Sequence, residues 1–310
     1  MRFGIALETF TPPGKIPSGD SILEMAQLAE RMGFDSVWVW DHIMLGSRKV
    51  YPVLDSLTML TAIGARTSKI KIGTGVLILP LRNPVVLAKT LSTIQSLSSG
   101  RLILGCAAGW YEREFKAVGV DFKKRGNIFE ESFQLVRKLL NEREVTYLSG
   151  SYNLEHATME PKADRIPMLI GGYSDSVLER AGRLADGWIS YYYKPESYSE
   201  SWNKVATSAR KDGRSPESMS RVDIVPLSIA SNFEVGDKIA RDFTARYTDL
   251  PKNSACTIES SVRGNISDCV AQIKKYESVG INDLVFIPSN YDLEQVEKAG
   301  NEILPNFIKK

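Results

Sequence analysis

Short runs of apolar residues alternate with longer amphipathic stretches along the whole chain. Eight of the short runs are rich in Val and Ile and have the length of buried strands, and a segment with helical periodicity follows each of them. This alternation is typical of a parallel sheet whose strands are each covered by the helix that follows. The predicted strands span residues 2–7, 35–41, 70–78, 101–106, 167–171, 187–191, 221–230 and 283–287.

Eight strand–helix units predict a closed α/β fold, the (β/α)8 TIM barrel. An open doubly wound sheet is the competing fold, and it carries a glycine-rich phosphate-binding turn after its first strand. Here the first strand runs into ETFTPPGKIPSGD, which has no such turn. The sequence therefore predicts one barrel domain over residues 1–310.

Three polar segments are too long for ordinary barrel connections, namely 110–126, 141–166 and 247–265. Active sites in this fold lie at the C-terminal ends of the strands. We expect the three segments to be insertions at that face of the barrel, where they cover the mouth of a pocket.

Charge and composition limit the class of partner. The 39 basic and 37 acidic residues leave a formal charge of +2, so no strong single-sign field is expected to attract nucleic acid or an acidic membrane. We expect a small-molecule substrate instead. The start of the chain lacks the features of a secretory signal, and no apolar run has membrane-spanning length, so we expect a cytoplasmic protein.

Asp41 and His42 close the second predicted strand, and His42 is one of only two histidines. A histidine in a barrel mouth can bind a cofactor ring or exchange a proton with a substrate. A capping aspartate beside an ordinary histidine is the alternative interpretation. Strand alternation places His42 on the same face as Trp38 and Trp40, which are bulky for a barrel interior, so a bend near Trp40 would re-aim His42.

Glycines interrupt two further strands. Gly73 and Gly75 lie in the third, where glycine marks either a packing bulge or the close approach of a ligand. Small residues occupy 105–109 at the end of the fourth strand, where a planar ring can lie against the backbone and Trp110 can wall the pocket. Tight core packing is the alternative explanation of this second stretch.

Gly171 and Gly172 end the fifth strand, just before a helix expected to begin near Ser174. Free N–H groups at a helix start, together with glycines and hydroxyls, form a natural phosphate site. Ordinary capping by Ser174 or Asp175 explains the same residues and is compatible with a phosphate. Glu8, at the end of the first strand, is a further pocket candidate, with surface exposure as the alternative.

These segments together resemble the luciferase-like monooxygenase superfamily, and the resemblance covers essentially the whole chain. Its most specific parts are the Asp41-His42 strand end and the stretches LRNPVVLAKTLSTIQSLSSGRLILGCAAGWYEREFKAVGV and IPMLIGGYSDSVLERAGRLADGWI. The resemblance implies a flavin-type ring in the barrel mouth, with its phosphate near Gly171, Gly172 and Ser174. In the deazaflavin branch it also implies a non-prolyl cis peptide, here at Gly75-Val76.

The resemblance leaves two cofactors open, coenzyme F420 and FMN. Bacterial luciferases carry a phosphate-binding arginine where this chain has Ala108, which favours F420. With F420 the protein is expected to be an oxidoreductase that transfers a hydride to or from a small organic substrate, while His42 transfers the proton. Glu8 is expected to be a second acid or an orienting group.

With FMN the protein would be a monooxygenase that uses O2 and takes reduced flavin from a separate reductase. A flavin-binding protein without turnover is the least favoured hypothesis. A flavin or F420 reductase is therefore a possible partner, and a homodimer is expected. The sequence does not predict the identity of the substrate.

The predicted catalytic residues are His42 and Glu8. No metal site is expected, because no second His or Cys stands at ligand spacing from His156. Residues expected to contact the cofactor are Asp41, His42, Thr74, Gly75, Val76, Ala107, Ala108, Gly109, Trp110, Gly171, Gly172 and Ser174.

Overall fold

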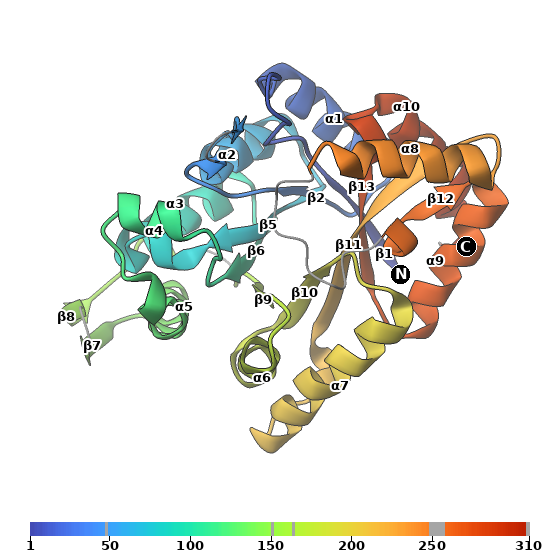
Figure 1. The fold of residues 1–310 in the computed structure, drawn as a ribbon. Helices are drawn as coiled ribbons and strands as arrows, with labels where there is room; N and C mark the ends of the chain where they lie inside the picture. Colours follow the sequence, from blue (N-terminus) through green and yellow to red (C-terminus); the bar gives the residue numbers. More distant parts are fainter. Residues whose placement is uncertain (47–48, 150–151, 163–164, 248–257, 308–310) are drawn as a thin grey trace.

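Eight parallel strands form a closed barrel in the computed structural model, which describes residues 1–46, 49–149, 152–162, 165–247 and 258–307 (Figure 1). The strands follow chain order around the barrel, and pairing of the sixth strand with the seventh closes the ring. The barrel strands are β1 (Arg2–Ala6), β2 (Ser36–Val39), β5 (Lys71–Ile78), β6 (Leu102–Ala107), β9 (Met168–Gly171), β10 (Gly187–Tyr191), β11 (Ser220–Ile229) and β13 (Asp283–Pro288). The predicted (β/α)8 TIM barrel is confirmed.

Helices surround the barrel (Figure 1). Several begin at residues suited to a helix start: the Ser18 side chain accepts a hydrogen bond from the Ser21 N–H, and Pro84 takes a first position that needs no N–H donor. No helix among the described residues is long and apolar enough to span a membrane. The helices are α1 (Gly19–Arg31), α2 (Ser56–Arg66), α3 (Pro84–Leu97), α4 (Glu112–Ala117), α5 (Arg125–Asn141), α6 (Asp175–Leu184), α7 (Pro195–Lys211), α8 (Phe233–Ala245), α9 (Ile266–Ser278) and α10 (Leu293–Lys298).

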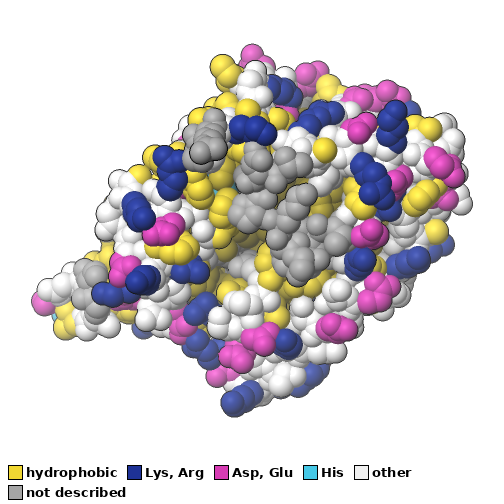
Figure 2. Space-filling model, viewed as in Figure 1, with side chains coloured by type: hydrophobic (Ala, Val, Ile, Leu, Met, Phe, Trp, Pro, Cys, Tyr) yellow, Lys and Arg dark blue, Asp and Glu magenta, His cyan; other side chains and the backbone are white. Residues whose placement is uncertain are grey.

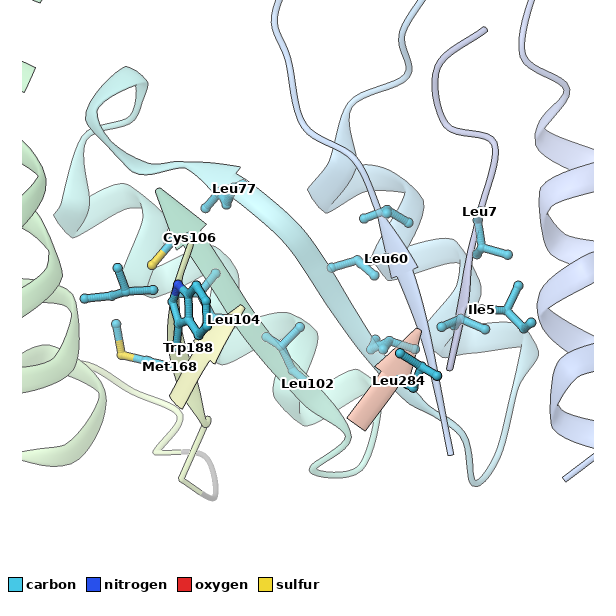
Figure 3. Close-up of a cluster of buried hydrophobic side chains, with 14 of the residues drawn as sticks. Ile5, Leu7, Leu60, Leu77, Leu102, Leu104, Cys106, Met168, Trp188 and Leu284 are labelled. Carbon is cyan, nitrogen blue, oxygen red and sulfur yellow. The ribbon is translucent and has the colours of Figure 1, made fainter. Parts of the chain in front are cut away.

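Side chains of the strands pack into an outer and an inner cluster. The outer cluster lies between the barrel and the helices and includes Leu104 and Trp188 (Figure 3). The inner cluster fills the barrel and includes Trp38, which is 2% exposed. A Cβ atom on Gly73 would lie 2.7 Å from Cε3 of Trp38. The glycine therefore makes room for the bulky indole, and packing explains Gly73.

Residues 110–126 and the described part of 247–265 lie at the C-terminal ends of the strands. Residues 110–126 follow β6 and contain α4. Within 247–265, residues 248–257 lie outside the described part, while β12 (Val262–Gly264) pairs with the last residues of β11. A short hairpin that was not predicted, β3 (Leu45–Gly46) with β4 (Val50–Tyr51), follows β2 at the same end.

The prediction for the remaining insertion, 141–166, is wrong. This segment connects the end of α5 to the start of β9, and a connection from helix to strand lies at the N-terminal ends of the strands. It forms the antiparallel hairpin β7 (Val145–Ser149) and β8 (Tyr152–Ala157), which projects beyond α5 at the edge of the molecule (Figure 1). It therefore does not cover the mouth.

Candidate functional site

The loop after β2 carries the first candidate residues. The predicted strand reached residue 41, but β2 ends at Val39. The N–H of Trp40 then donates to the Thr9 hydroxyl, at 2.9 Å. The alternation that placed Trp38 and His42 on one face therefore stops before His42. The strand therefore does not determine the direction of the His42 side chain.

His42 binds an acid that was not among the predicted site residues. Its Nδ1 lies 2.9 Å from Oε2 of Glu114, which belongs to α4 in the insertion after β6. The other oxygen of Glu114, Oε1, accepts the N–H groups of Ile43 at 2.5 Å and Met44 at 3.1 Å. The His42 side chain is 13% exposed and that of Glu114 is fully buried. Among the described residues, Nε2 of His42 has no hydrogen-bond partner.

Aromatic contacts dock the same insertion onto the loop. The ring of Trp110 meets that of His42 edge to face, with centroids 5.6 Å apart, and the hydroxyl of Tyr111 donates to the Gly46 carbonyl at 2.7 Å. Trp110 is 43% exposed, so it stands beside His42 with part of its surface open to solvent.

The three small residues before Trp110 have different surroundings. Ala107 ends β6 and is partly buried, whereas Ala108 packs against the outer hydrophobic cluster. Gly109 has a φ of 81°, and a Cβ there would lie 2.6 Å from Cγ2 of Ile78. Gly109 is thus needed for the turn that leads from β6 to α4.

Asp41 is an anchor for this loop. Its buried carboxylate accepts two hydrogen bonds from the Arg82 guanidinium, each 2.8 Å long. It also accepts the Ser56 hydroxyl at 2.7 Å and the Ile78 N–H at 2.9 Å. The carboxylate is fully used by the protein, so the structure gives Asp41 a supporting role and does not bring its carboxylate to a ligand.

Thr74 is also fully buried, and its hydroxyl donates to the Gly105 carbonyl at 2.7 Å. This bond joins β5 to β6 where their register shifts between Thr74 and Leu77. The side chain of Thr74 supports the sheet irregularity and is not presented to the mouth.

The peptide bond between Gly75 and Val76 is cis, as the resemblance implied. The Tyr191 hydroxyl donates to the Gly75 carbonyl. Val76 is partly buried against the inner cluster of the barrel. A Cβ on Gly171 would lie 2.8 Å from Cγ1 of Val76, so the glycine lets β9 approach this bulge closely.

The turn from β9 into α6 lacks a side-chain cap. Ser174 is the N-cap residue, but its side chain accepts no hydrogen bond from the first turn of the helix. Its hydroxyl instead lies 3.1 Å from that of Ser176. Gly172 precedes the turn with a φ of 135°. The first N–H groups of α6 are therefore not capped by this side chain, and two hydroxyls stand beside them, which suits a phosphate.

Glu8 lies on a different part of the mouth from His42, and the described residues show no contact between them. Its carboxylate pairs with Lys15 at 2.6 Å. Burial raises the pKa of Tyr247, and the negative charge of Glu8 is the next largest cause.

Aromatic rings pack around one another at this mouth. Trp40 stacks on Tyr191 with centroids 5.4 Å apart, and Phe10 meets Trp40 at 5.8 Å and Tyr247 at 5.3 Å. Tyr191 and Tyr192 pack against the inner cluster, whereas Tyr193 belongs to the outer one. In Figure 2, hydrophobic side chains are visible between the central part of the face and the charged side chains nearer its edge.

The described cysteines are buried, and the described residues form no metal-binding group. Cys106 and Cys269 are buried, and burial raises the pKa of the Cys269 thiol to about 12. Cys256 lies outside the described residues. Within the described part of the chain, no group of three or more His, Cys, Asp or Glu residues is placed to hold a metal ion.

Comparison with known proteins identifies relatives of the whole chain. It is 28% identical over 344 residues to a 5,10-methylenetetrahydromethanopterin reductase of Methanolobus tindarius, covering 100% of this chain and 97% of the relative. It is 31% identical over 317 residues to an F420-dependent glucose-6-phosphate dehydrogenase of Segniliparus rotundus, covering 92% and 93%.

Among solved structures, an F420-dependent secondary alcohol dehydrogenase in complex with an F420-acetone adduct has the same fold. It superposes with a TM-score of 0.84 at 20% identity, over 99% of both chains. The family model described as luciferase-like monooxygenase matches residues 1–289. The chain therefore belongs to the luciferase-like monooxygenase family.

Proposed function

We propose that this protein is an F420-dependent oxidoreductase that transfers a hydride between the deazaflavin and a small organic substrate. The observation that carries the proposal is the geometry of His42. One ring nitrogen is held by a buried acid, and the other has no partner among the described residues. An imidazole held in this way can exchange a proton with a substrate hydroxyl or carbonyl oxygen.

The residues around the mouth fit the proposed cofactor. The uncapped first turn of α6, with Gly172, Ser174 and Ser176, would bind a phosphate. Gly171, together with Gly75 and Val76 at the cis peptide, would support the ring, with Ala107 to Trp110 at its side. F420 supplies a two-electron hydride acceptor or donor when it is bound. We keep these residues and His42 as the proposed site, with Asp41 and Thr74 as its supports.

His42 would complete the redox reaction by moving the proton. Bound F420 would supply the hydride acceptor for oxidation of an alcohol, and Nε2 of His42 would take the proton from the substrate hydroxyl. For reduction of a carbonyl, Nε2 of His42 would return the proton to the substrate oxygen. Glu8 has no contact with His42, so we assign it an orienting role toward the substrate and not a role in this proton transfer.

The choice of F420 over FMN rests on Ala108 and on relatives whose names specify F420. Those relatives act on unlike substrates, a sugar phosphate and a secondary alcohol, so they do not identify the substrate of this chain. The aromatic mouth favours a substrate with an apolar body. The alternative is an FMN-dependent monooxygenase that uses O2 and receives reduced flavin from a separate reductase.

The remaining features of the proposal concern assembly and location. We propose a single domain over residues 1–310, a homodimer, a cytoplasmic location and a separate reductase that regenerates the cofactor. The balanced composition of the chain and its family support these proposals.

The test is turnover of F420 with a panel of alcohols, aldehydes, ketones and enones, followed by the absorbance of the cofactor. We expect turnover with a member of the panel. In His42→Ala, kcat should fall by about 10²- to 10⁴-fold while the fold is kept. His156→Ala is the matched control, because the His156 side chain is 79% exposed on the peripheral hairpin. Equal turnover in the two variants would remove His42 from the reaction. Formation of an oxygenated product that requires both reduced FMN and O2 would favour the alternative.

A further inference from the structure

We infer that Glu114 is a positioning residue that fixes which nitrogen of His42 carries the proton. The inference rests on the proposed function and deepens it. Of its two measurements, only the turnover assay requires that the proposed function be correct. Glu114 lies 72 residues from His42 in the chain, and the fold brings Oε2 to within 2.9 Å of Nδ1.

The orientation of the Glu114 carboxylate is set by the backbone. Oε1 accepts two N–H groups, from Ile43 and Met44, so this oxygen cannot rotate away without breaking both hydrogen bonds. Oε2 is thereby aimed at the histidine ring. The Glu114 side chain has no exposed surface, so solvent does not compete for either oxygen.

The orientation has a chemical consequence for His42. A carboxylate accepts hydrogen bonds and donates none, so Nδ1 must be the nitrogen that carries hydrogen in the neutral ring. Nε2 then keeps a lone pair, which is the form needed to take a proton from a substrate hydroxyl. After that transfer, the negative charge of Glu114 stabilises the imidazolium in a buried setting where charges interact strongly.

Glu114→Gln separates this role from structural support. The Gln amide oxygen can keep both backbone hydrogen bonds, so its NH2 group replaces Oε2 opposite the ring. That group donates to Nδ1, which must then be bare, and the hydrogen of neutral His42 moves to Nε2. The variant preserves the shape of the site and reverses the tautomer.

The experiment is nitrogen NMR of the full-length protein labelled with ¹⁵N-histidine and free of cofactor. The chain has two histidines, and exposed His156 serves as an internal reference. We expect neutral His42 to carry its hydrogen on Nδ1 in the wild-type protein and on Nε2 in Glu114→Gln. With F420 and a substrate, kcat of the variant should fall at least about 100-fold while KM changes about twofold or less.

Glu112→Gln is the matched control, since Glu112 lies on the same short helix but is 54% exposed and pairs with Lys116. It should leave both the tautomer and kcat unchanged. An Nε2-bound hydrogen on wild-type His42 would overturn the inference, and this result needs no variant to fold. An unchanged His42 spectrum in folded Glu114→Gln would overturn it as well.

Failure of the proposed function gives a different result. If the tautomers behave as expected and no substrate reduces or oxidises F420, the positioning by Glu114 stands and the F420 reaction falls. The NMR measurement therefore distinguishes the two.

Discussion

The two histidines of this chain make the same contact in opposite surroundings. Nδ1 of His42 lies 2.9 Å from a glutamate at the barrel mouth, and Nδ1 of His156 lies 2.8 Å from Glu144 on the peripheral hairpin. At the mouth the two side chains are 13% and 0% exposed, and on the hairpin they are 79% and 58% exposed. The distance is nearly equal, so the difference between the sites is burial.

Burial decides what such a pair can do. Water screens an exposed ion pair and lets both side chains turn, so it stabilises the fold by about 0–1 kcal/mol. A buried carboxylate with fixed donors has one available orientation and imposes it on its partner. His42 at the mouth is therefore held in one orientation, whereas His156 on the hairpin is solvated and free to turn.

Removing the buried acid should have the largest effect on stability. Glu114→Ala leaves the N–H groups of Ile43 and Met44 without an acceptor and opens a cavity, so we expect a loss of about 3–5 kcal/mol in the free energy of unfolding. Urea denaturation measures this loss. Glu112→Ala on the same helix should cost about 0.5 kcal/mol. Equal losses in the two variants would contradict the argument that burial makes Glu114 more important for stability than Glu112.

Two glycines show the same contrast between buried and open surroundings in terms of packing. Gly73→Ala places a Cβ 2.7 Å from the Trp38 indole, and we expect it to cost about 1–3 kcal/mol of stability. Gly126 in α5 has no atom closer than 3.7 Å to its Cβ position, so Gly126→Ala should stabilise the protein by up to about 1 kcal/mol. Thermal unfolding of both variants checks the opposite signs. Stabilisation by Gly73→Ala would show that the barrel interior is loosely packed.

A second buried acid, Asp223, differs from Glu114 in its hydrogen bonds. Asp223 on β11 accepts the Ser190 hydroxyl at one oxygen, but its Oδ2 has no partner among the described residues. Burial raises the pKa of Asp223 well above its ordinary value. The folded state therefore binds a proton that the unfolded chain releases, so this contribution to stability is lost as pH rises above about 4.

Asp223→Asn removes that dependence. The variant should unfold with a weaker loss of stability between pH 4 and neutrality, and the gain relative to wild type at pH 7 should be about 1 kcal/mol or more. Denaturation at several pH values is the measurement. Parallel curves for wild type and variant would mean that Asp223 ionises in the folded protein as readily as in the unfolded chain.

The exposed pair should show the smallest effect. Glu144→Gln is expected to change stability by less than about 0.5 kcal/mol, and added salt should remove what remains. Urea denaturation at low and high salt tests this. A loss as large as that of Glu114→Ala would end the contrast between the two histidines.

The strands were predictable because local pattern determines them. Runs such as KIGTGVLI and RVDIVPLSI are rich in β-branched residues, and their order fixes a parallel barrel. The cis peptide at Gly75-Val76 followed from resemblance, because no local pattern specifies it. The misplaced insertion 141–166 shows a different limit: length reveals an insertion, but only the order of helix and strand tells which end of the barrel it occupies.

Glu114 escaped prediction because its role depends on distant contacts. In the segment YEREFKAVG it stands beside Glu112 and looks like another solvent-facing acid of a short helix. The buried Phe115 next to it was the one local signal that this helix packs inward. The partners of Glu114 are contributed by the loop after β2, which no pattern within α4 can indicate.

The central claim is tested most directly by equilibrium titration of the purified protein with F420 and with FMN, each oxidised and reduced, followed by fluorescence. We expect F420 to bind at least about tenfold more tightly than FMN, a difference of about 1.4 kcal/mol in binding free energy. Tighter binding of reduced FMN, or binding of neither cofactor, would contradict the account.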